Sequence, residues 1–437
     1  MTQSPLPPTT ISIPELRAGL RGQVILPGEG GYDPARAVFY GGFDRRPAAI
    51  VRPAGTDDIA RVLAYARRSG AALAVRSGGH SVAGHSVCEG GIVLDLRQMK
   101  ALEIDAGQRL AWAETGLTAG EYTAAAGEYG LATGFGDTGS VGIGGITLGG
   151  GVGYLVRKYG LTIDSLLAAE IMTADGQLLY VDTHSHPDLF WAMRGGGGNF
   201  GVATRFKFQL HEVGPVVGGM LFLPAAPETI AAFMAAAEAA PEELSGILNV
   251  MPAPPAPFVP PELVGQLVLL ALLVYTGEAE AGQRALAPFR ALAQPLADLL
   301  RPMRYPEMFP PEEAGYTPTA VSHTMFVERI DVPAAETILR FLQASDAPMR
   351  VAQLRVLGGA MARVPVEETA FAHRKAPIMV NLAAFYTGPQ DRPARQAWLD
   401  DFRGALQQGN SGVYVNFLEE SGPAGVQAAY PGETWSR

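Results

Sequence analysis

The sequence predicts an α+β fold in two parts, and two observations indicate it. Between residues 45 and 88, a strand, a helix, a strand and a glycine-rich loop follow one another, a succession typical of a nucleotide-binding unit. From residue 216 onward, longer strands are mixed with helices, which predicts one sheet backed by helices. A chain of 437 residues has room for two or three domains.

Composition narrows the class of protein. Apolar residues make up 48% of the chain and charged residues 17%, a globular balance. The net charge of −10, without a basic run, argues against nucleic acid and anionic membranes as partners. The single cysteine, Cys88, allows neither an intrachain disulfide nor a cysteine-based metal site. We find no signal peptide and no apolar run of about 18 residues, so we expect a cytoplasmic protein without a spanning helix.

The first part begins with a Pro- and Thr-rich arm at 1–12 and continues with short elements. Thr56, Asp57 and Asp58 are expected to cap a helix that ends near Ser69, because acidic residues suit the first turn of a helix and basic residues suit the last. The other helices are predicted at 13–19, 33–40, 118–129 and 187–194. The strands are predicted within 45–53 and at 72–75, 91–95, 109–114 and 205–210.

The loop that follows the strand at 72–75 carries the most chemistry. It reads Arg76-Ser77-Gly78-Gly79-His80, and Ser81, Gly84, His85 and Ser86 follow. The two glycines allow positive φ and close approach to a ligand, and successive N–H groups can form an anion-binding nest. Serine hydroxyls and the Arg76 charge make a diphosphate the expected ligand, with His80 as a nucleophile toward an electrophilic cofactor. An ordinary glycine-rich turn with a hydrogen-bonded histidine is the alternative.

Two further segments are dense in glycine. Residues 134–153 hold ten glycines among twenty positions, interspersed with Ile, Leu and Val, which fits backbone packed against a flat ligand. The run from Gly195 to Gly198 leads into a strand, so it is not a GxGxxG dinucleotide fingerprint, which requires a following helix.

These segments resemble the FAD-linked oxidases of the vanillyl-alcohol oxidase superfamily, most closely the berberine-bridge-enzyme-like branch. The resemblance rests on Arg-Ser-Gly-Gly-His-Ser at 76–81, the glycine segment 134–153, Thr-Ala-Asp-Gly at 173–176 and Arg-Gly-Gly-Gly-Gly-Asn-Phe-Gly at 194–201. It implies a two-domain, PCMH-type FAD-binding fold with an antiparallel-sheet substrate domain backed by helices. It also implies FAD bonded through His80 to the flavin 8α-methyl.

The resemblance implies cofactor contacts along all three glycine segments and the final segment of the chain. They are Arg76, Ser77, Gly78, Gly79, His80, Ser81, Gly84, His85, Ser86, Thr138, Val141, Gly142, Gly144, Gly145, Leu148, Gly149, Gly150, Gly151, Gly153, Tyr154, Asn199, Gly201, Val202, Tyr414 and Asn416. Many relatives have a second flavin-bonded cysteine where this chain has Thr138, so we expect a monocovalent flavin. Val141 is similar to the residue of oxygen-reactive members and favours an oxidase.

The second part is predicted to carry four strands and four helices. The strands are expected at 218–223, 267–275, 352–357 and 378–386, the helices at 228–240, 278–293, 334–345 and 392–406, and a Pro-rich loop at 251–261. Residues 413–418 are predicted to be the last strand and resemble the family segment that returns to the flavin domain, with a shortened tail. The predicted domains are therefore 1–215 for FAD, 216–410 for the substrate and 411–437 as the returning segment.

Three residues are candidates for substrate chemistry. A flavin oxidase needs a proton acceptor beside the substrate. Some relatives use a carboxylate at the position of Gln353, which cannot act as a base, so Tyr414 is the remaining candidate, with a packing role as its alternative. Arg355 lies on the same strand face as Gln353. It is expected to hold an anionic or phenolate substrate or to pair with a carboxylate.

The predicted function is an FAD oxidase that takes a hydride from an alcohol, sugar, amine or phenolic metabolite of secondary metabolism and passes electrons to molecular oxygen, giving hydrogen peroxide. A dehydrogenase with another electron acceptor and a flavin-binding protein without turnover are the alternatives. A metal enzyme built on His80 and His85, or on His184 and His186, is disfavoured because neither pair has a recognisable set of further ligands.

Overall fold

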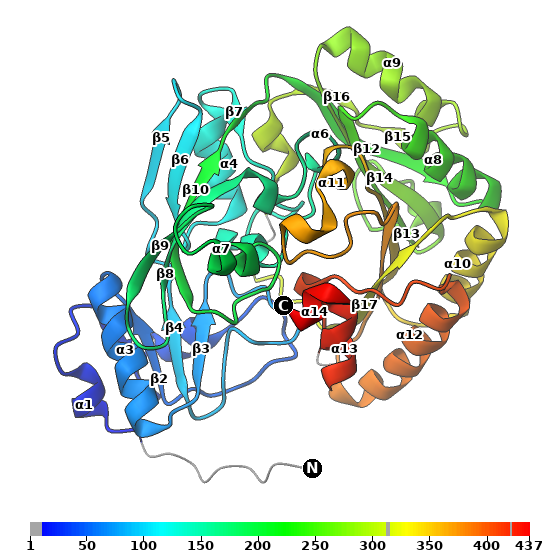
Figure 1. The fold of residues 1–437 in the computed structure, drawn as a ribbon. Helices are drawn as coiled ribbons and strands as arrows, with labels where there is room; N and C mark the ends of the chain where they lie inside the picture. Colours follow the sequence, from blue (N-terminus) through cyan, green and yellow to red (C-terminus); the bar gives the residue numbers. More distant parts are fainter. Residues whose placement is uncertain (1–10, 312–314, 420–421) are drawn as a thin grey trace.

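The computed structural model describes residues 11–311, 315–419 and 422–437 (Figure 1). The arm predicted at 1–12 therefore falls almost wholly outside the described residues. The described chain forms the predicted α+β architecture, with three smaller sheets in its first half and one large antiparallel sheet in its second.

The first half builds a four-stranded and a five-stranded sheet. The four-stranded sheet has the order β1-β2-β4-β3, in which β4 pairs in parallel with both β2 and β3. Its strands are β1 (Gln23–Ile25), β2 (Ala49–Arg52), β3 (Leu73–Arg76) and β4 (Ile92–Asp95). The antiparallel five-stranded sheet consists, in spatial order, of β5 (Leu102–Asp105), β6 (Leu110–Glu114), β10 (Val202–Gln209), β8 (Leu166–Met172) and β9 (Leu178–Val181). A two-stranded sheet joins β7 (Leu131–Ala132) and β11 (His211–Glu212).

Short helices accompany these sheets. They are α1 (Ile13–Arg17), α2 (Tyr32–Arg36), α3 (Thr56–Ser69), α4 (Ala119–Gly127), α5 (Ile143–Leu148), α6 (Val156–Tyr159) and α7 (Pro187–Met193). Helix α3 has the predicted bounds, but Gly55 and not Thr56 is its N-cap residue. The Asp58 carboxylate instead accepts hydrogen bonds from the backbone N–H groups of Arg21, Gly22 and Ala54, which ties the helix to the preceding loops.

The second half builds an eight-stranded antiparallel sheet. Its strands, in spatial order, are β15 (Ala297–Asp298), β12 (Val216–Pro224), β14 (Leu267–Thr276), β13 (Leu244–Pro252), β18 (Arg350–Val356), β19 (Ile378–Phe385) and β17 (Ala320–Val327), with β16 (Arg301–Met303) also paired to β12. The long helices are α8 (Pro227–Ala239), α9 (Ala279–Arg290), α10 (Val332–Ala344) and α12 (Arg392–Leu406). Short helices are α11 (Ala360–Arg363), α13 (Gly422–Ala429) and α14 (Glu433–Ser436).

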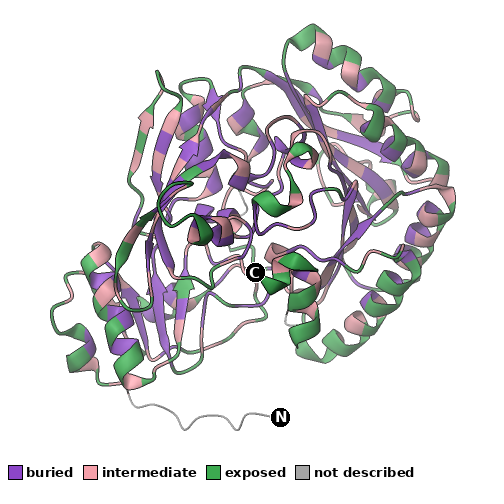
Figure 2. Ribbon diagram, viewed as in Figure 1, coloured by how far each residue is buried: buried purple, intermediate pink, exposed green. Residues whose placement is uncertain are grey.

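One face of this sheet packs against helices and the other faces the first half of the chain. Leu248, Leu354 and Val380 belong to a buried cluster that includes residues of α8, α9, α10 and α12, which lie on the outer side of the sheet (Figure 1). Figure 2 shows the strands buried and the outer sides of these helices exposed. On the opposite face, Met379 and Phe326 pack with residues of the glycine segment and the final segment. This second face therefore lies where the site is expected.

Several elements differ from prediction. Residues 413–418 form no strand; they contain only a 3-10 turn at Val415–Phe417. The backbone N–H of Tyr414 donates to the Thr324 hydroxyl and not to a neighbouring strand's carbonyl, because this segment crosses the sheet face. Strands β5, β13 and β17 were not predicted, and β13 continues into the predicted Pro-rich loop. Helix α5, inside the glycine segment, was not predicted either. The domain boundaries at 215 and 410 remain a prediction.

Candidate active site between the glycine segments and the large sheet

The three glycine segments pack against one another. A Cβ on Gly78 would lie 2.2 Å from the backbone nitrogen of Gly142, and a Cβ on Gly142 would lie 2.1 Å from that of Gly78. Ser77 links the same two loops, since its hydroxyl accepts from the Gly144 N–H (3.2 Å) and donates to the Thr115 carbonyl (2.6 Å). The N–H groups of Gly195 and Gly197 in the third segment donate to the Leu148 carbonyl, at 3.0 and 2.9 Å.

Many of these glycines serve contact between chain segments. A Cβ on Gly149 would lie 2.0 Å from Asn416 Oδ1, and one on Gly151 would lie 1.9 Å from Thr162 Oγ1. Gly145, in contrast, is exposed, and a Cβ there would meet nothing within 4 Å. The high glycine content thus has two causes, which are close packing of backbone on backbone and an accessible surface at Gly145.

His80, the predicted site of flavin attachment, lies at this junction. It is half-buried; its Nε2 lies 2.8 Å from Ser140 Oγ, and its ring is stacked on Phe39 with centroids 4.1 Å apart and planes 20° apart. The same Phe39 also binds the first glycine loop through its backbone, because its N–H donates to the Gly79 carbonyl. Phe39 and Ser140 orient the imidazole, and sequence reasoning identified neither of them.

Arg76 occupies a different place from the one predicted. Its side chain is fully buried, and its guanidinium donates to the carbonyls of Ala35, Arg36, Ala37 and Ser86. Burial lowers its pKa to about 10. The Arg76 guanidinium therefore fixes the loops around 35–37 and 86. The prediction that it faces a phosphate of the ligand is wrong, because its donors bind backbone carbonyls.

The remainder of the first loop wraps around this buried arginine. The backbone N–H of His85 donates to the Ser81 hydroxyl (3.2 Å), and the His85 side chain is exposed. Gly84 has φ of +69°, and a Cβ there would lie 2.5 Å from the Phe43 ring. The Ser86 hydroxyl is buried without a hydrogen-bond partner among the described residues.

Tyr414 and Asn416 lie on the glycine segment. The Tyr414 hydroxyl oxygen accepts from the Gly151 N–H (2.9 Å) and from Asn416 Nδ2 (2.8 Å), and Asn416 Nδ2 also donates to the Ile146 carbonyl (3.2 Å). Burial raises the pKa of Tyr414, and the two donors oppose that effect. A phenol in this setting stays protonated at neutral pH.

A polar chain connects the large sheet to the glycine segment. Arg355 donates to Gln353 Oε1 from Nε (3.0 Å) and Nη2 (2.7 Å), and its Nη2 also lies 2.5 Å from Asp137 Oδ2. Gln353 Nε2 in turn donates to Asn249 Oδ1 (3.0 Å). Of the two roles expected for Arg355, the structure shows pairing with a carboxylate. Sequence reasoning missed Asp137, although it is the only charged residue between 134 and 153.

The other predicted residues are distributed around this core. The Thr138 hydroxyl donates to Asp137 Oδ1 (3.2 Å), and half-buried Val141 donates its N–H to the Thr138 carbonyl (3.4 Å). Tyr154 is buried, and its burial together with the nearby Asp137 raises its pKa. Gly150 is buried beside Phe371, and Gly153 packs against Gly136. Gly201 has φ of +147° and packs against β8, Val202 is buried, and Asn199 is exposed.

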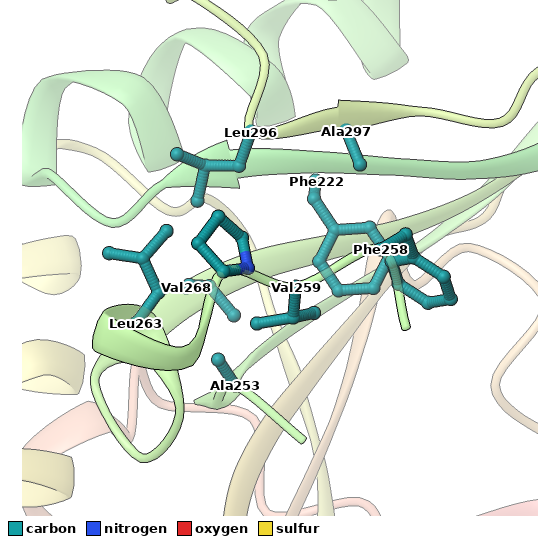
Figure 3. Close-up of a pocket in the computed structure, with 9 residues that line it drawn as sticks. Phe222, Ala253, Phe258, Val259, Leu263, Val268, Leu296 and Ala297 are labelled. Atoms are coloured by element: carbon teal, nitrogen blue, oxygen red, sulfur yellow. The ribbon is translucent and has the colours of Figure 1, made fainter. Parts of the chain in front are cut away.

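Two cavities accompany these contacts. One is lined by Val152, Gly153, Tyr154, Ser245 and Arg355, among others, and its water-accessible volume is about 10 Å³, about what one water molecule requires. The other lies at the far end of the large sheet, between β12, β14 and the loop after β13, and all its lining side chains are apolar (Figure 3). The first cavity belongs to the candidate site, whereas the second carries no group for chemistry.

In the described ranges, no group of three or more His, Cys, Asp or Glu side chains is placed to hold a metal ion. Among the helices of the described chain, none is both long and apolar enough to cross a bilayer.

Known proteins share both the sequence and the fold. Residues 47–182 match the family of FAD binding domains. An FAD-linked oxidoreductase of Bacillus subtilis is 29% identical over 91% of this chain and 88% of its own length. (R)-6-hydroxynicotine oxidase of Paenarthrobacter nicotinovorans is 40% identical, over 44% of this chain and only 42% of that protein. The structure of a Physcomitrella patens BBE-like protein superposes with a TM-score of 0.87, at 20% identity, over 97% of this chain and 95% of that one, which shows the fold.

The glycine segments, the matched FAD binding domain and the superposed fold agree. The chain therefore matches FAD binding domains at 47–182, has the fold of the BBE-like structure, and is similar over most of its length to an FAD-linked oxidoreductase.

Proposed function

We propose that this FAD-linked oxidoreductase is an oxidase with its flavin bonded to His80, which passes electrons from a small organic substrate to molecular oxygen. The observation that carries the proposal is the setting of His80, half-buried where the first two glycine segments meet and oriented by Ser140 and Phe39. A side chain held by a hydrogen bond and a stacked ring is ready to react without first being ordered. The (R)-6-hydroxynicotine oxidase that matches in sequence is named as an oxidase, which supports this choice.

The residues fit FAD because backbone can approach a ligand closely at this site. Gly145 is exposed and open and follows Gly144, which contacts Ser77 of the first loop, and His80 and Ser81 of that loop are partly accessible. We propose that these residues, with Val141, Tyr414 and Asn416, hold the cofactor. Thr138 has no thiol, so the proposed linkage is through His80 alone.

When bound, FAD supplies a two-electron acceptor for a hydride from a substrate C–H bond. The chain must position the substrate and accept the proton of the neighbouring O–H or N–H group. Gln353 has no basic group, and its amide oxygen is occupied by Arg355. We propose that Tyr414 accepts this proton in its phenolate form, which the hydrogen bonds from Gly151 and Asn416 favour.

The covalent linkage is tested by denaturing the protein in acid and measuring flavin absorbance in the washed pellet and the supernatant. We expect a yellow pellet from wild type and a colourless pellet from His80→Ala. His85→Ala is the matched control, because this exposed histidine lies in the same loop, and its pellet should stay yellow. Release of all flavin from wild type would contradict the linkage but not FAD binding.

Oxidase and dehydrogenase differ in how they treat oxygen. After reduction by dithionite without air, an oxidase mixed with aerated buffer reoxidises rapidly and releases peroxide. Slow reoxidation would favour the dehydrogenase. Bleaching of the flavin by any organic substrate would exclude a protein without turnover.

A further inference from the structure

Over the four neighbouring strands β13, β18, β19 and β17, one cross-strand row of the large sheet carries uncharged polar side chains. Asn249 of β13 pairs in register with Gln353 of β18, which pairs with Asn381 of β19, which pairs with Thr324 of β17. Side chains alternate between the two faces of a strand. The neighbours of this row in sequence pack against the helices, so the row faces the glycine segment and the final segment, where Thr324 accepts from the Tyr414 N–H.

The positive charge of Arg355, beside this row, is already neutralised by a carboxylate of the protein. Arg355 is 4% exposed, and its guanidinium is held by Gln353, by the Val152 carbonyl and by the Asp137 carboxylate. The Asp137 side chain is itself 19% exposed and lies on the glycine segment, opposite the sheet. A guanidinium whose donors are used within the protein offers little to a substrate anion.

Asn381 adds a hydrogen-bond acceptor, its side-chain oxygen. Its Oδ1 is buried and has no hydrogen-bond partner among the described residues. Such an atom costs free energy unless a donor reaches it, and a substrate hydroxyl is a suitable donor. Its neighbours Gln353 and Asn249 are engaged with one another.

We propose that Asp137 determines substrate specificity by neutralising Arg355, so that the site takes an uncharged, hydroxyl-bearing substrate and disfavours one that carries a carboxylate. The proposal rests on the proposed function and selects among the substrate classes that the sequence leaves open. Asp137 is a positioning and charge-compensating residue here, and it forms no bond to the substrate. Its removal would free one edge of the Arg355 guanidinium for a carboxylate.

The test compares binding of benzyl alcohol and benzoate to the FAD-loaded protein by isothermal titration calorimetry. Wild type is expected to bind benzyl alcohol more tightly than benzoate. In Asp137→Asn, the dissociation constant of benzoate should fall about tenfold or more, the size of a charge-assisted hydrogen bond, while that of benzyl alcohol changes less than twofold. Asp137→Glu, which keeps the charge, should behave like wild type.

Asp164→Asn is the matched control. Asp164 forms the other buried carboxylate–arginine pair between the two halves, with Arg374 at 2.7 and 2.8 Å, and its loss should leave the benzoate constant unchanged. Should Asp137→Asn fail to fold, Arg355→Gln decides the matter. With Asp137 uncompensated, benzoate should then bind about tenfold more weakly than in wild type.

The proposal is overturned if wild type prefers benzoate, or if benzoate binds Asp137→Asn no more tightly than wild type. This readout is independent of peroxide and of the covalent bond. A failed oxidase assay or a colourless acid pellet would therefore count against the proposed function alone.

Discussion

At the scale of single residues, Tyr414 is subject to two opposing effects. Burial disfavours its phenolate, while hydrogen bonds from Gly151 and Asn416 favour it. The phenol is therefore the main form at neutral pH, and the phenolate proposed to accept the substrate proton is a minor form that these two donors favour.

We expect Tyr414→Phe to lower the rate of flavin reduction about 100-fold, the usual contribution of a positioned acid or base, with flavin content unchanged. Stopped-flow absorbance under nitrogen measures this rate. Tyr305→Phe is the control, since that hydroxyl is fully buried and has no partner in the described chain. A reduction rate of Tyr414→Phe within threefold of wild type would leave this tyrosine a packing role only.

Arg76 shows what residue types alone cannot decide. An arginine before two glycines predicts an anion site, and the sequence contains nothing to exclude it. In the fold, the strand β3 directs this side chain inward, where carbonyls from 35–37 and 86 surround it. Asp137 is the converse case, because only the fold brings this loop residue to Arg355, 218 positions away.

At the scale of elements, Arg157 joins α6 of the first half to the end of α8 in the second. Its guanidinium donates to the carbonyls of Ala237 in the last turn of α8 (2.6 Å) and of its C-cap residue Ala240 (2.9 Å), which are among the groups that lack intrahelical partners. It also donates to the carbonyl of Leu244, the first residue of β13 (3.2 Å). Burial lowers the pKa of Arg157. This one side chain thus fixes a helix end and the contact between the two halves.

We expect Arg157→Met to lower the free energy of unfolding by about 2–4 kcal/mol, because several buried carbonyls lose their donor. Urea denaturation followed by circular dichroism measures the change. Arg284→Met on α9 is the control; its ion pair with Glu280 is 4.0 Å long and largely exposed, so we expect a loss below about 0.5 kcal/mol. Equal losses in the two variants would contradict the role of Arg157.

Element prediction succeeded where local chemistry is strong. The bounds of α3, predicted from signals at both ends, are confirmed, and so are the predicted bounds of α12. The final segment at 413–418 was predicted as a strand, but its residue types suit both a strand and an extended crossing segment. Only pairing with a neighbouring strand separates the two, and pairing is a tertiary property.

At the scale of the whole molecule, three histidines are held neutral by burial. The pKa values of His211, His323 and His373 are each lowered to about 4, mainly by burial. In the unfolded chain they titrate near pH 6.5. Their contribution to the free energy of unfolding is therefore complete above about pH 6.5 and is lost as pH falls toward 4. In this range the unfolded state binds protons at these histidines and the folded state does not.

We expect the melting temperature to fall steadily between pH 6.5 and 4, with each histidine contributing up to about 3 kcal/mol over this window. Differential scanning calorimetry across that range measures it. His323→Gln should show a shallower dependence than wild type, since this half-buried ring lies near Arg403 and Asp400 on the helix-covered side. If the melting temperature of this variant falls with pH as steeply as that of wild type, His323 does not contribute to the pH dependence.

The sequence by itself determined the class of fold, the resemblance to FAD-linked oxidases and the character of the glycine loops, because these depend on short runs of residues whose conformational needs are local. It also placed His80 and Tyr414 among the candidates. Only the tertiary structure decided which groups meet: that Arg76 is buried, that Ser140 and Phe39 orient His80, and that Asp137 cancels the charge of Arg355. Contacts between distant segments depend on how the two halves pack, and no local pattern in the chain encodes that packing.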